Sequence, residues 1–495
     1  MVYDIRMDIQ QQAHNTNHFP VLKRTKIIAT LGPATDSYEQ VYDVIKAGAN
    51  GLRLNFSHGD HKEHGQRIEW VRKASKELKK PVAIIVDLQG PKIRLGNLVD
   101  NHYDVKKGDT LQLTYGIEHD GGSNLPIQYD LSQKVHPGER VYMFDGKVRA
   151  TVTGIEGKTI SVEIENDGFL MSRKGFNLPD TDFSGDVITE KDYRDIDYAV
   201  KNDVDFLALS FVQSEDDINL LRGYLAEHDR PDIHIIAKVE TKAAIEEDVL
   251  EHIVAASDAV MVARGDLAVE VGAEIVPVVQ RHIMRLCQKH ARISIVATQM
   301  LMSMVTNPEP TRAEVSDVAT SVIFGTDCVM LSDETANGSY PVEAIKSMKR
   351  VILHTQENIP SHVLDAPITG DSHSMAISHS AVLLSRELGT AGIIAETKSG
   401  ATAQNISAHR PHRTIFSVTS DPRVAQQLAM LYANKSFLKP DDGRAGQDLA
   451  NELVRKGFLK KGDSVVIISG RTPGKKGQTD TIRVRRLDDI SPDEE

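Results

Sequence analysis

The sequence is poor in cysteine and in aromatic residues. Among 495 residues there are two cysteines, Cys287 and Cys328, a single tryptophan, and 5% aromatic residues in all. Two cysteines outside any CxxC or Cys/His cluster cannot build a disulfide framework, and they argue against a structural zinc site. This usage favours a reducing compartment.

Long apolar runs are also absent. No run approaches the roughly 20 residues of a membrane span, and the first 20 residues lack the apolar core of a signal peptide. Seventy acidic against 58 basic residues give a formal net charge of −12, which argues against a nucleic-acid or anionic-membrane surface. We therefore expect a cytoplasmic protein with neither kind of partner, preceded by a tail at residues 1–21.

What the sequence does contain is a series of short, continuously apolar runs with helix-like segments between most of them. Such runs are typical of parallel strands covered on both faces. Eight units of this kind predict an α/β fold, a closed (β/α)₈ barrel. The runs lie at 25–32, 51–59, 81–90, 204–211, 233–240, 259–267, 293–300 and 328–335. Among the helix signals, Thr311 and Glu314 form a capping-box pattern, and Gly325 is placed to end that helix.

The chain is longer than one barrel requires. Between the third run and the fourth, residues 89–185 alternate polar and apolar positions with frequent glycines, which predicts an inserted small antiparallel β unit. The barrel would then comprise 22–88 and 186–358. Renewed strand and helix patterns over 371–495 predict a third, C-terminal α/β domain.

Polar residues end most of the apolar runs, and in such barrels the carboxyl ends of the strands carry the catalytic groups. Charges gathered at one rim cost free energy to desolvate unless they are paired, so this set indicates a functional site. Its members are Arg53, Asn55, Ser57, Asp87, Ser210, Lys238, Glu240, Arg264, Asp266, Thr298, Gln299, Ser332 and Glu334.

Two of these carboxylates suggest a metal site. Glu240 and Asp266, on adjacent strands, can each offer one carboxylate to Mg²⁺, and the alternative is an ion pair with Lys238 or Arg264. Lys238 and Glu240 point to the same face of one strand, and a cation beside a metal suits phosphoryl or enolate charge. Thr298 can pass a proton through its hydroxyl, or simply bond to backbone.

Longer motifs surround these residues in a fixed order: RTKIIATLGPATDS, GLRLNFSHG, DLQGPKIR, RKGFNLP, AKVE, MVARGDL, ATQMLMSM, PTRAEVSDVA and GTDCVMLSDETANGSYP. Together they resemble the pyruvate kinase family over nearly the whole chain after the tail. The resemblance implies a barrel, an inserted small β-barrel lid domain and a C-terminal α/β regulatory domain. It also implies transfer of the phosphoryl group of phosphoenolpyruvate to ADP, giving ATP and pyruvate through a Mg-stabilised enolate, the last step of glycolysis.

The resemblance implies roles for the rim residues. Glu240 and Asp266 would bind Mg²⁺, with Mn²⁺ as an alternative, while Lys238 and Arg53 would face the transferred phosphoryl group. Amides around Gly265 and Asp266 would hold the substrate carboxylate. The enolate carbon would lie near Thr298, with Ser332 and Glu334 able to share the proton step. ADP or ATP phosphates would contact Asn55, His58, Arg94 and, from the lid, Lys174.

A monovalent-cation site is implied as well. Many family members hold K⁺ with the equivalents of Asn55, Ser57, Asp87 and the carbonyl of Leu88, and carry glutamate where this chain has Lys92. Members with lysine there resemble a K⁺-independent branch, because an ammonium group can supply the same positive charge. We therefore expect no K⁺ requirement; the alternative is a solvated lysine at the lid hinge.

In the last domain, TKSGATAQN resembles the loop that receives an effector's phosphate. Thr397, Ser399, Gly400 and Thr402 would bind it at a helix start. The resemblance implies a phosphorylated activator, such as a sugar monophosphate, AMP or fructose bisphosphate, and a homotetramer. The alternative is a regulatory site that has lost its ligand.

Two rival functions remain at the level of sequence. Another phosphoenolpyruvate or pyruvate-enolate barrel, of aldolase or mutase type, would share the metal carboxylates but leave Lys174 and Arg94 unexplained. A catalytically dead metabolite sensor would be marked by loss of Lys238, Glu240, Asp266 or Thr298, and all four are present.

Overall fold

The computed structural model describes residues 22–91, 93–144, 146–181, 187–359, 373–470, 474, 477 and 479–487. Within them, eight parallel strands close into a barrel, in the order β1-β16-β15-β14-β13-β12-β3-β2, which confirms the predicted fold class. The strands are β1 (Lys26–Leu31), β2 (Gly51–Asn55), β3 (Ala83–Asp87), β12 (Phe206–Leu209), β13 (His234–Val239), β14 (Ala259–Ala263), β15 (Ile293–Ala297) and β16 (Cys328–Leu331).

The barrel strands are buried on both faces, as their continuously apolar sequences require. All positions of β1, β3, β14 and β15 are buried. One side of each strand packs in the barrel interior, and the other packs against the surrounding helices. These helices are α1 (Tyr38–Ala47), α2 (His61–Glu77), α3 (Glu190–Lys201), α4 (Glu215–Glu227), α5 (Glu247–Ala256), α7 (Val276–Lys289), α8 (Arg312–Ile323) and α10 (Pro341–Asn358).

Local signals set several helix ends. The Thr311 hydroxyl accepts a hydrogen bond from the amide of Glu314 at 3.3 Å, and the Glu314 carboxylate accepts one from the amide of Thr311 at 2.8 Å. This capping box begins α8, and Gly325 follows its end with φ of 75°, a conformation that glycine adopts without strain. Both predictions for this helix are confirmed.

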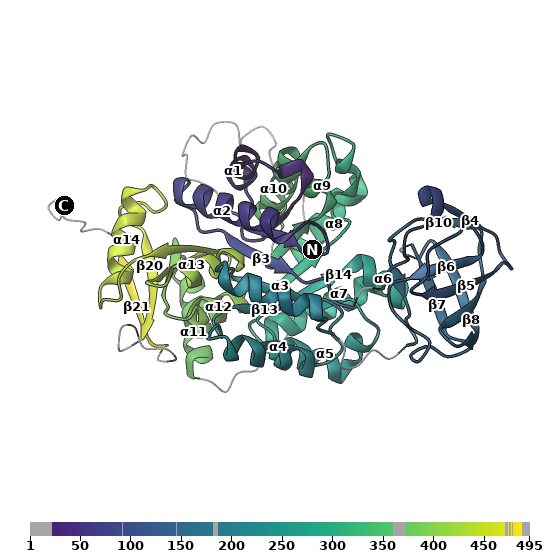
Figure 1. The fold of residues 1–495 in the computed structure, drawn as a ribbon. Coiled ribbons are helices and arrows are strands. Elements are labelled where there is room, and N and C mark those ends of the chain that lie inside the picture. The colour runs from purple at the N-terminus through teal and green to yellow at the C-terminus, as the bar shows by residue number, and fades with distance from the viewer. Residues whose placement is uncertain are drawn as a thin grey trace, which may run out of the picture.

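The inserted β unit, described over residues 93–144 and 146–181, has its own core and lies at one end of the molecule (Figure 1). Its six-stranded sheet has the order β11-β7-β8-β9-β5-β6, and a separate pair joins β10 to β4. The strands are β4 (Tyr103–Val105), β5 (Thr110–Tyr115), β6 (Asn124–Ile127), β7 (Arg140–Met143), β8 (Val148–Glu156), β9 (Thr159–Ile164), β10 (Gly168–Leu170) and β11 (Phe176–Asn177).

The pairing within the inserted unit differs from the expected antiparallel arrangement in one place. Strands β5 and β6 are parallel, because the connection between them carries the chain back along the strand instead of turning in a hairpin. The two edges of the six-stranded sheet are linked through one short segment. Arg94 bridges Gly175 next to β11, and Leu95 bridges Ile127 in β6.

A second α/β layer follows the barrel and lies at the end opposite the inserted unit (Figure 1). Four parallel strands and one antiparallel edge strand have the order β19-β18-β17-β20-β21. The strands are β17 (Gly392–Glu396), β18 (Thr414–Thr419), β19 (Asn434–Leu438), β20 (Ser464–Gly470) and β21 (Thr479–Arg486). The accompanying helices are α11 (His373–Glu387), α12 (Ala401–Ala408), α13 (Pro422–Gln427) and α14 (Ala445–Arg455).

The C-terminal layer closes the amino end of the barrel, opposite the rim that carries the polar residues. Asp327, just before β16, is fully buried and pairs with the buried Arg410 at 2.7 Å. Its other oxygen accepts the amide of Tyr432 at 3.0 Å. Met430 and Leu431 belong to the same buried cluster as the side chains inside the barrel. The rim that carries the polar residues therefore faces the inserted unit.

Within the described parts of the chain, no helix combines the length and apolar character needed to cross a membrane.

Removing Arg410 should destabilise the protein strongly, because Asp327 would remain as a buried charge without its guanidinium. We expect Arg410→Met to lower the free energy of unfolding by about 3 kcal/mol. Urea unfolding followed by far-UV circular dichroism measures this. Lys346→Ala, which removes the exposed pair between Lys346 and Glu343, should leave the urea midpoint unchanged. Equal midpoints for Arg410→Met and the parent would contradict the burial argument.

Candidate active site

The carboxyl ends of the barrel strands surround a cavity of about 650 Å³. Most of the lining side chains reach it from a strand end or from the loop that follows. Of the predicted residues, this cavity brings together Arg53, Asn55, Ser57, His58, Arg94, Lys238, Glu240, Asp266, Thr298 and Ser332. Asp87, Leu88, Gly265 and Glu334 lie around its wall, and Lys174 lies in an adjoining cavity.

A single buried carboxylate holds two cations of the cavity, Arg53 and Lys238. Asp87, which is 1% exposed, accepts from Arg53 Nε at 2.6 Å and lies 3.3 Å from Lys238 Nζ. Lys238 also donates to Ser210 Oγ at 2.6 Å, and Ser210 donates to the carbonyl of Leu88 at 2.7 Å. Both cations are thereby fixed at one wall with well-defined geometry.

Burial and charge pairing oppose each other in this network. Burial alone would raise the pKa of Asp87, but Arg53 and Lys238 outweigh it and lower that pKa below its ordinary value. Burial likewise acts to lower the pKa of Lys238, whereas Asp87 and Glu240 raise it overall. Asp87 is therefore ionised and Lys238 charged at neutral pH.

Glu240 and Asp266 supply two further carboxylates to the cavity. Glu240 is fully buried; its Oε1 accepts the amide of Phe211 at 2.8 Å, and its Oε2 lies 3.5 Å from Lys238 Nζ. Asp266 stands in the first turn of the short helix α6 (Arg264–Val271) and lines the same cavity. Arg264 points away from the cavity, because its Nη1 donates to both carboxylate oxygens of Asp317, at 2.8 and 2.7 Å.

This donor set fits a hard divalent cation. Mg²⁺ is typically bound by one or two carboxylates and completes its shell with water and substrate oxygens. In the described parts of the chain, no group of three or more His, Cys, Asp or Glu side chains is arranged to hold a metal ion. Glu240 and Asp266 can therefore supply two ligands of such a cation, and the remaining ligands would be water and substrate oxygens.

Thr298 is held in a strained conformation at the end of β15. Its φ is 68°, in the left-handed region, and Gln299 follows with φ of 55°. The Thr298 hydroxyl oxygen accepts the amide of Gly265 at 2.9 Å, and its carbonyl accepts from Arg264 Nη2 at 2.6 Å. Strain of this kind persists only where neighbours fix it, and it concentrates at functional sites.

Glu334 lies behind the cavity wall. It is fully buried, and its two oxygens accept the amides of Leu301 at 3.0 Å and Ser332 at 2.7 Å. The adjacent Ser332 lines the cavity itself. Glu334 is thus placed to hold the turn that presents Ser332.

A second cavity, of about 590 Å³, adjoins the first beneath the inserted unit. Ser57, His58 and Arg94 line both cavities, so the two lie side by side. Lys174 enters from the inserted unit, with its Nζ 5.1 Å from the ring centre of Phe144. Burial, followed by the nearby Arg94 and Arg53, lowers the pKa of His58. His58 is therefore neutral at pH 7.

The predicted monovalent-cation residues are placed as follows. Asn55 Oδ1 accepts the amide of Ser57 at 3.2 Å, Asp87 pairs with the two cations, and the carbonyl of Leu88 accepts from Ser210. Lys92, on which the prediction of K⁺ independence depends, lies outside the described residues.

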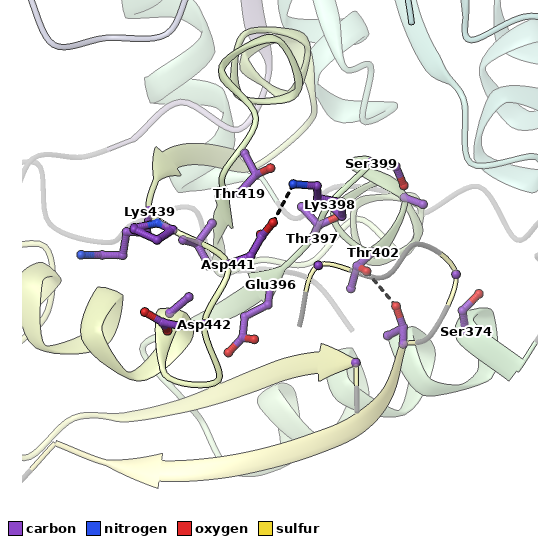
Figure 2. Close-up of a pocket in the computed structure, with 18 of the residues that line it drawn as sticks. Ser374, Glu396, Thr397, Lys398, Ser399, Thr402, Thr419, Lys439, Asp441 and Asp442 are labelled. Carbon is purple, nitrogen blue, oxygen red and sulfur yellow. Dashed lines mark hydrogen bonds and ion pairs between the residues drawn. The ribbon is translucent and has the colours of Figure 1, made fainter. Parts of the chain in front are cut away.

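Three of the predicted effector residues, Thr397, Ser399 and Thr402, line a separate cavity of about 80 Å³ in the C-terminal layer (Figure 2). Gly400 precedes α12 with φ of 88°, and its amide donates to Thr397 Oγ1 at 3.0 Å. Thr402 and Thr479 share a hydroxyl hydrogen bond of 2.8 Å. Figure 2 also shows Lys398 drawn toward Asp441, whose carboxylate it contacts at 2.6 Å.

Several contributors to the site were not singled out as functional from sequence. Thr30 Oγ1 accepts from Arg53 Nη1 at 3.2 Å, and its position in the first apolar run was a usable signal. Ser210 was recognised at the rim but given no role. Asp317 lies within α8, away from any strand end. No local sequence pattern predicts that it pairs with Arg264.

Together, a closed (β/α)₈ barrel and a rim of paired cations and carboxylates define an enzyme that acts on a small anionic substrate. Comparison with known families narrows this class. The family model "Pyruvate kinase, barrel domain" matches residues 22–345, and "Pyruvate kinase, alpha/beta domain" matches residues 375–485. The chain therefore belongs to the pyruvate kinase family and is a transferase enzyme of that family.

Individual relatives agree. The pyruvate kinase of Corynebacterium glutamicum is 38% identical over 94% of this chain and 98% of that protein. The pyruvate kinase of Mycobacterium tuberculosis is 38% identical over 94% of this chain and all of that protein. That of Clostridium acetobutylicum is 36% identical over 94% of this chain and 99% of that protein.

Replacing Asp87 tests the charge network. Asp87→Asn should lower the free energy of unfolding by about 3 kcal/mol at pH 7, because two buried cations lose their shared carboxylate. Since the folded-state pKa of Asp87 lies below the unfolded value of about 3.9, its contribution is fully present above that value and is lost only as the pH falls through the lower folded pKa.

The difference between Asp87→Asn and the parent should therefore be constant in urea titrations at pH 5, 6 and 7. A difference that shrinks over this interval would mean that Asp87 titrates near neutrality, contrary to the pairing described here.

Proposed function

We propose that this protein transfers the phosphoryl group of phosphoenolpyruvate to ADP, giving ATP and pyruvate. The observation that carries the proposal is the convergence of Lys238 and Arg53 on Asp87, beside Glu240 and Asp266, in a cavity that adjoins the one lined by Lys174. In this reaction a terminal oxygen of ADP forms a bond to phosphorus while the enol oxygen leaves with its electron pair. The enolate then takes a proton at its methylene carbon.

Pyruvate kinases generally use Mg²⁺, and the carboxylates of Glu240 and Asp266 would hold it in this chain. When bound, the cation would neutralise negative charge on the phosphoryl and enolate oxygens. Mn²⁺ accepts the same oxygen donors and is a second metal to test.

Lys238 and Arg53 would act on the phosphoryl group itself. Phosphoryl transfer places charge on the three equatorial oxygens, and fixed cations stabilise it without reorganisation at the moment of reaction. Both side chains are only 12% exposed and are held by Asp87, so they present this charge in a preorganised geometry. Substrate oxygens would replace water as their remaining partners.

The substrate carboxylate would bind at the amides of Gly265 and Asp266, at the start of α6. In this structure the Gly265 amide donates to Thr298 Oγ1, so a carboxylate at Gly265 competes with that hydroxyl. We expect substrate binding to release Thr298, whose hydroxyl would then relay a proton to the enolate carbon. Ser332 would share the relay, with Glu334 holding its amide.

The nucleotide would occupy the second cavity. Asn55, His58 and Arg94 would contact its phosphates from the barrel side, and Lys174 would contact them from the inserted unit acting as a lid. Closure of this lid would exclude water from the reacting groups and so prevent hydrolysis of the substrate. An aldolase or mutase barrel has no use for Arg94 and Lys174, which favours the kinase reaction.

The remaining proposals concern the requirement for K⁺, the location and oligomeric state of the protein, and its activator. We propose that K⁺ is not required because Lys92 supplies the positive charge, as in the branch of the family with lysine at this position. We also propose a cytoplasmic homotetramer, and a phosphorylated activator bound by Thr397, Ser399, Gly400 and Thr402. The hydroxyls at the start of α12 support an anion-binding role.

Lys238→Met should reduce turnover by about three orders of magnitude or more, because a fixed charge opposite the transferring phosphoryl group is lost. Pyruvate formation from phosphoenolpyruvate and ADP with Mg²⁺ measures this, with and without a sugar monophosphate as activator. Lys201→Met, at an exposed position at the end of α3, provides the matched control. Full activity of Lys238→Met would refute the assigned role, and an inactive parent would refute the proposed reaction.

Lys92→Glu should make activity depend on added K⁺, because the carboxylate needs the cation that the ammonium group replaces. The same assay in K⁺-free buffer and with K⁺ added measures the response. The parent should be active in both buffers. A parent active only with K⁺ would overturn the Lys92 argument while leaving the reaction intact.

A further inference from the structure

Helix α6 contacts two functional regions with its two turns. Its first turn carries Gly265 and Asp266 at the barrel rim, where Arg264 anchors it through Asp317. Its second turn carries Val269 and Glu270 and contacts the inserted unit. One short, rigid element therefore connects the candidate metal site to the unit that supplies Lys174.

Glu270 makes a polar contact between α6 and the inserted unit. Its Oε1 accepts a hydrogen bond from Asn177 Nδ2 at 3.3 Å. Asn177 is 5% exposed and is the last residue of β11, just before the chain returns to the barrel. Both residues line a cavity of about 80 Å³ at this junction. Asn177 is buried and Glu270 is partly buried, so losing this hydrogen bond would leave a largely desolvated amide without that partner.

An apolar contact lies beside this hydrogen bond. Gly146 of the inserted unit has φ of 77°, and a Cβ added there would approach Val269 Cγ1 to 3.4 Å. The inserted unit therefore rests directly on the second turn of α6. Asn177 supplies the directional part of this contact and fixes how the two surfaces are aligned.

The strand that ends at Asn177 also positions the nucleotide residues. Lys174 lies three positions earlier, and its carbonyl accepts the amide of Leu95 at 3.0 Å. Arg94 bridges Gly175, and the amide of Phe176 donates to the carbonyl of Ile93 at 2.9 Å. Arg94 and Lys174 therefore belong to one hydrogen-bonded segment, which reaches α6 through Asn177.

We propose that Glu270 is a positioning residue, which sets the placement of Arg94 and Lys174 over the rim through its hydrogen bond to Asn177. This inference rests on the proposed nucleotide-binding role of these two side chains. Glu270 touches neither substrate, and it acts through the inserted unit. Its effect should therefore fall on ADP rather than on phosphoenolpyruvate.

The hydrogen bond itself, rather than the negative charge, carries this role. Burial raises the pKa of Glu270 to about 7, so the acid and the carboxylate are both populated near neutral pH. Each form offers an oxygen to the Asn177 amide. Glutamine offers the same oxygen without the charge, which makes Glu270→Gln the conservative variant.

The test is steady-state kinetics of pyruvate formation for Glu270→Ala, Glu270→Gln, Asn177→Ala and the double alanine variant. Glu270→Ala should raise the KM for ADP about tenfold, the expected effect of losing the hydrogen bond to Asn177, and change the KM for phosphoenolpyruvate less than twofold. Glu270→Gln should restore the parental KM for ADP. Asn177→Ala should match Glu270→Ala, and the double variant should be no worse than either single one.

The matched control is Glu274→Ala, an exposed glutamate four residues further along the chain, which should behave as the parent. Equal increases in both KM values would overturn the proposal, as would an unchanged KM for ADP in Glu270→Ala. Failure of Glu270→Gln to rescue would show that charge, not the hydrogen bond, matters, and would overturn it too.

A readout that needs no activity separates this inference from the proposed function. Hydrogen exchange of the Leu95 and Phe176 amides should be faster in Glu270→Ala than in Glu270→Gln, while amides of the C-terminal layer stay unchanged. Unchanged exchange at Leu95 and Phe176 would overturn the positioning role. An inactive parent with faster exchange in Glu270→Ala would refute the reaction alone.

Discussion

The candidate site depends on the placement of one carboxylate between two cations. Asp87 ends a fully buried strand, and it holds Arg53 from the neighbouring strand and Lys238 from the far side of β12. Without it, two positive side chains, each only 12% exposed, would repel each other with little screening by solvent. With it, both keep their charge and their direction. The order of strands around the barrel and the inward direction of the side chains bring these three residues together.

The rest of the site completes this arrangement. Ser210 links Lys238 to the backbone at Leu88, and Glu240 lies on the other side of the ammonium group. The cavity therefore presents an ordered series of charges, from the cations of β2 and β13 to the carboxylates of β13 and α6. A substrate with a phosphoryl group at one end and a carboxylate at the other matches this series.

Sequence was informative where local pattern and topology coincide. Continuous apolar runs predicted the barrel strands, and because the carboxyl ends of parallel strands share one rim, they also predicted which polar residues meet. The capping box at Thr311 followed from two residues. What could not be predicted depends on side-chain direction and register. Lys238 lies near the end of β13 and Arg264 directly after β14, yet Arg264 turns outward to Asp317 and Lys238 turns inward to Asp87. Two other contacts could not be predicted from a periodic pattern either. They are the parallel pairing of β5 with β6 and the hydrogen bond between Asn177 and Glu270.

The buried pair of Asp327 and Arg410 bears on where this protein can be divided. In the sequence, the barrel and the C-terminal layer look like separable modules, but the floor of the barrel is completed by Met430 and Leu431 from that layer. A chain shortened to the barrel alone would expose the apolar ends of its central strands and leave Asp327 without its cation. The barrel and the C-terminal layer, which a sequence comparison distinguishes, thus depend on each other for their stability. Any attempt to transplant the C-terminal layer onto another barrel would have to carry this floor with it.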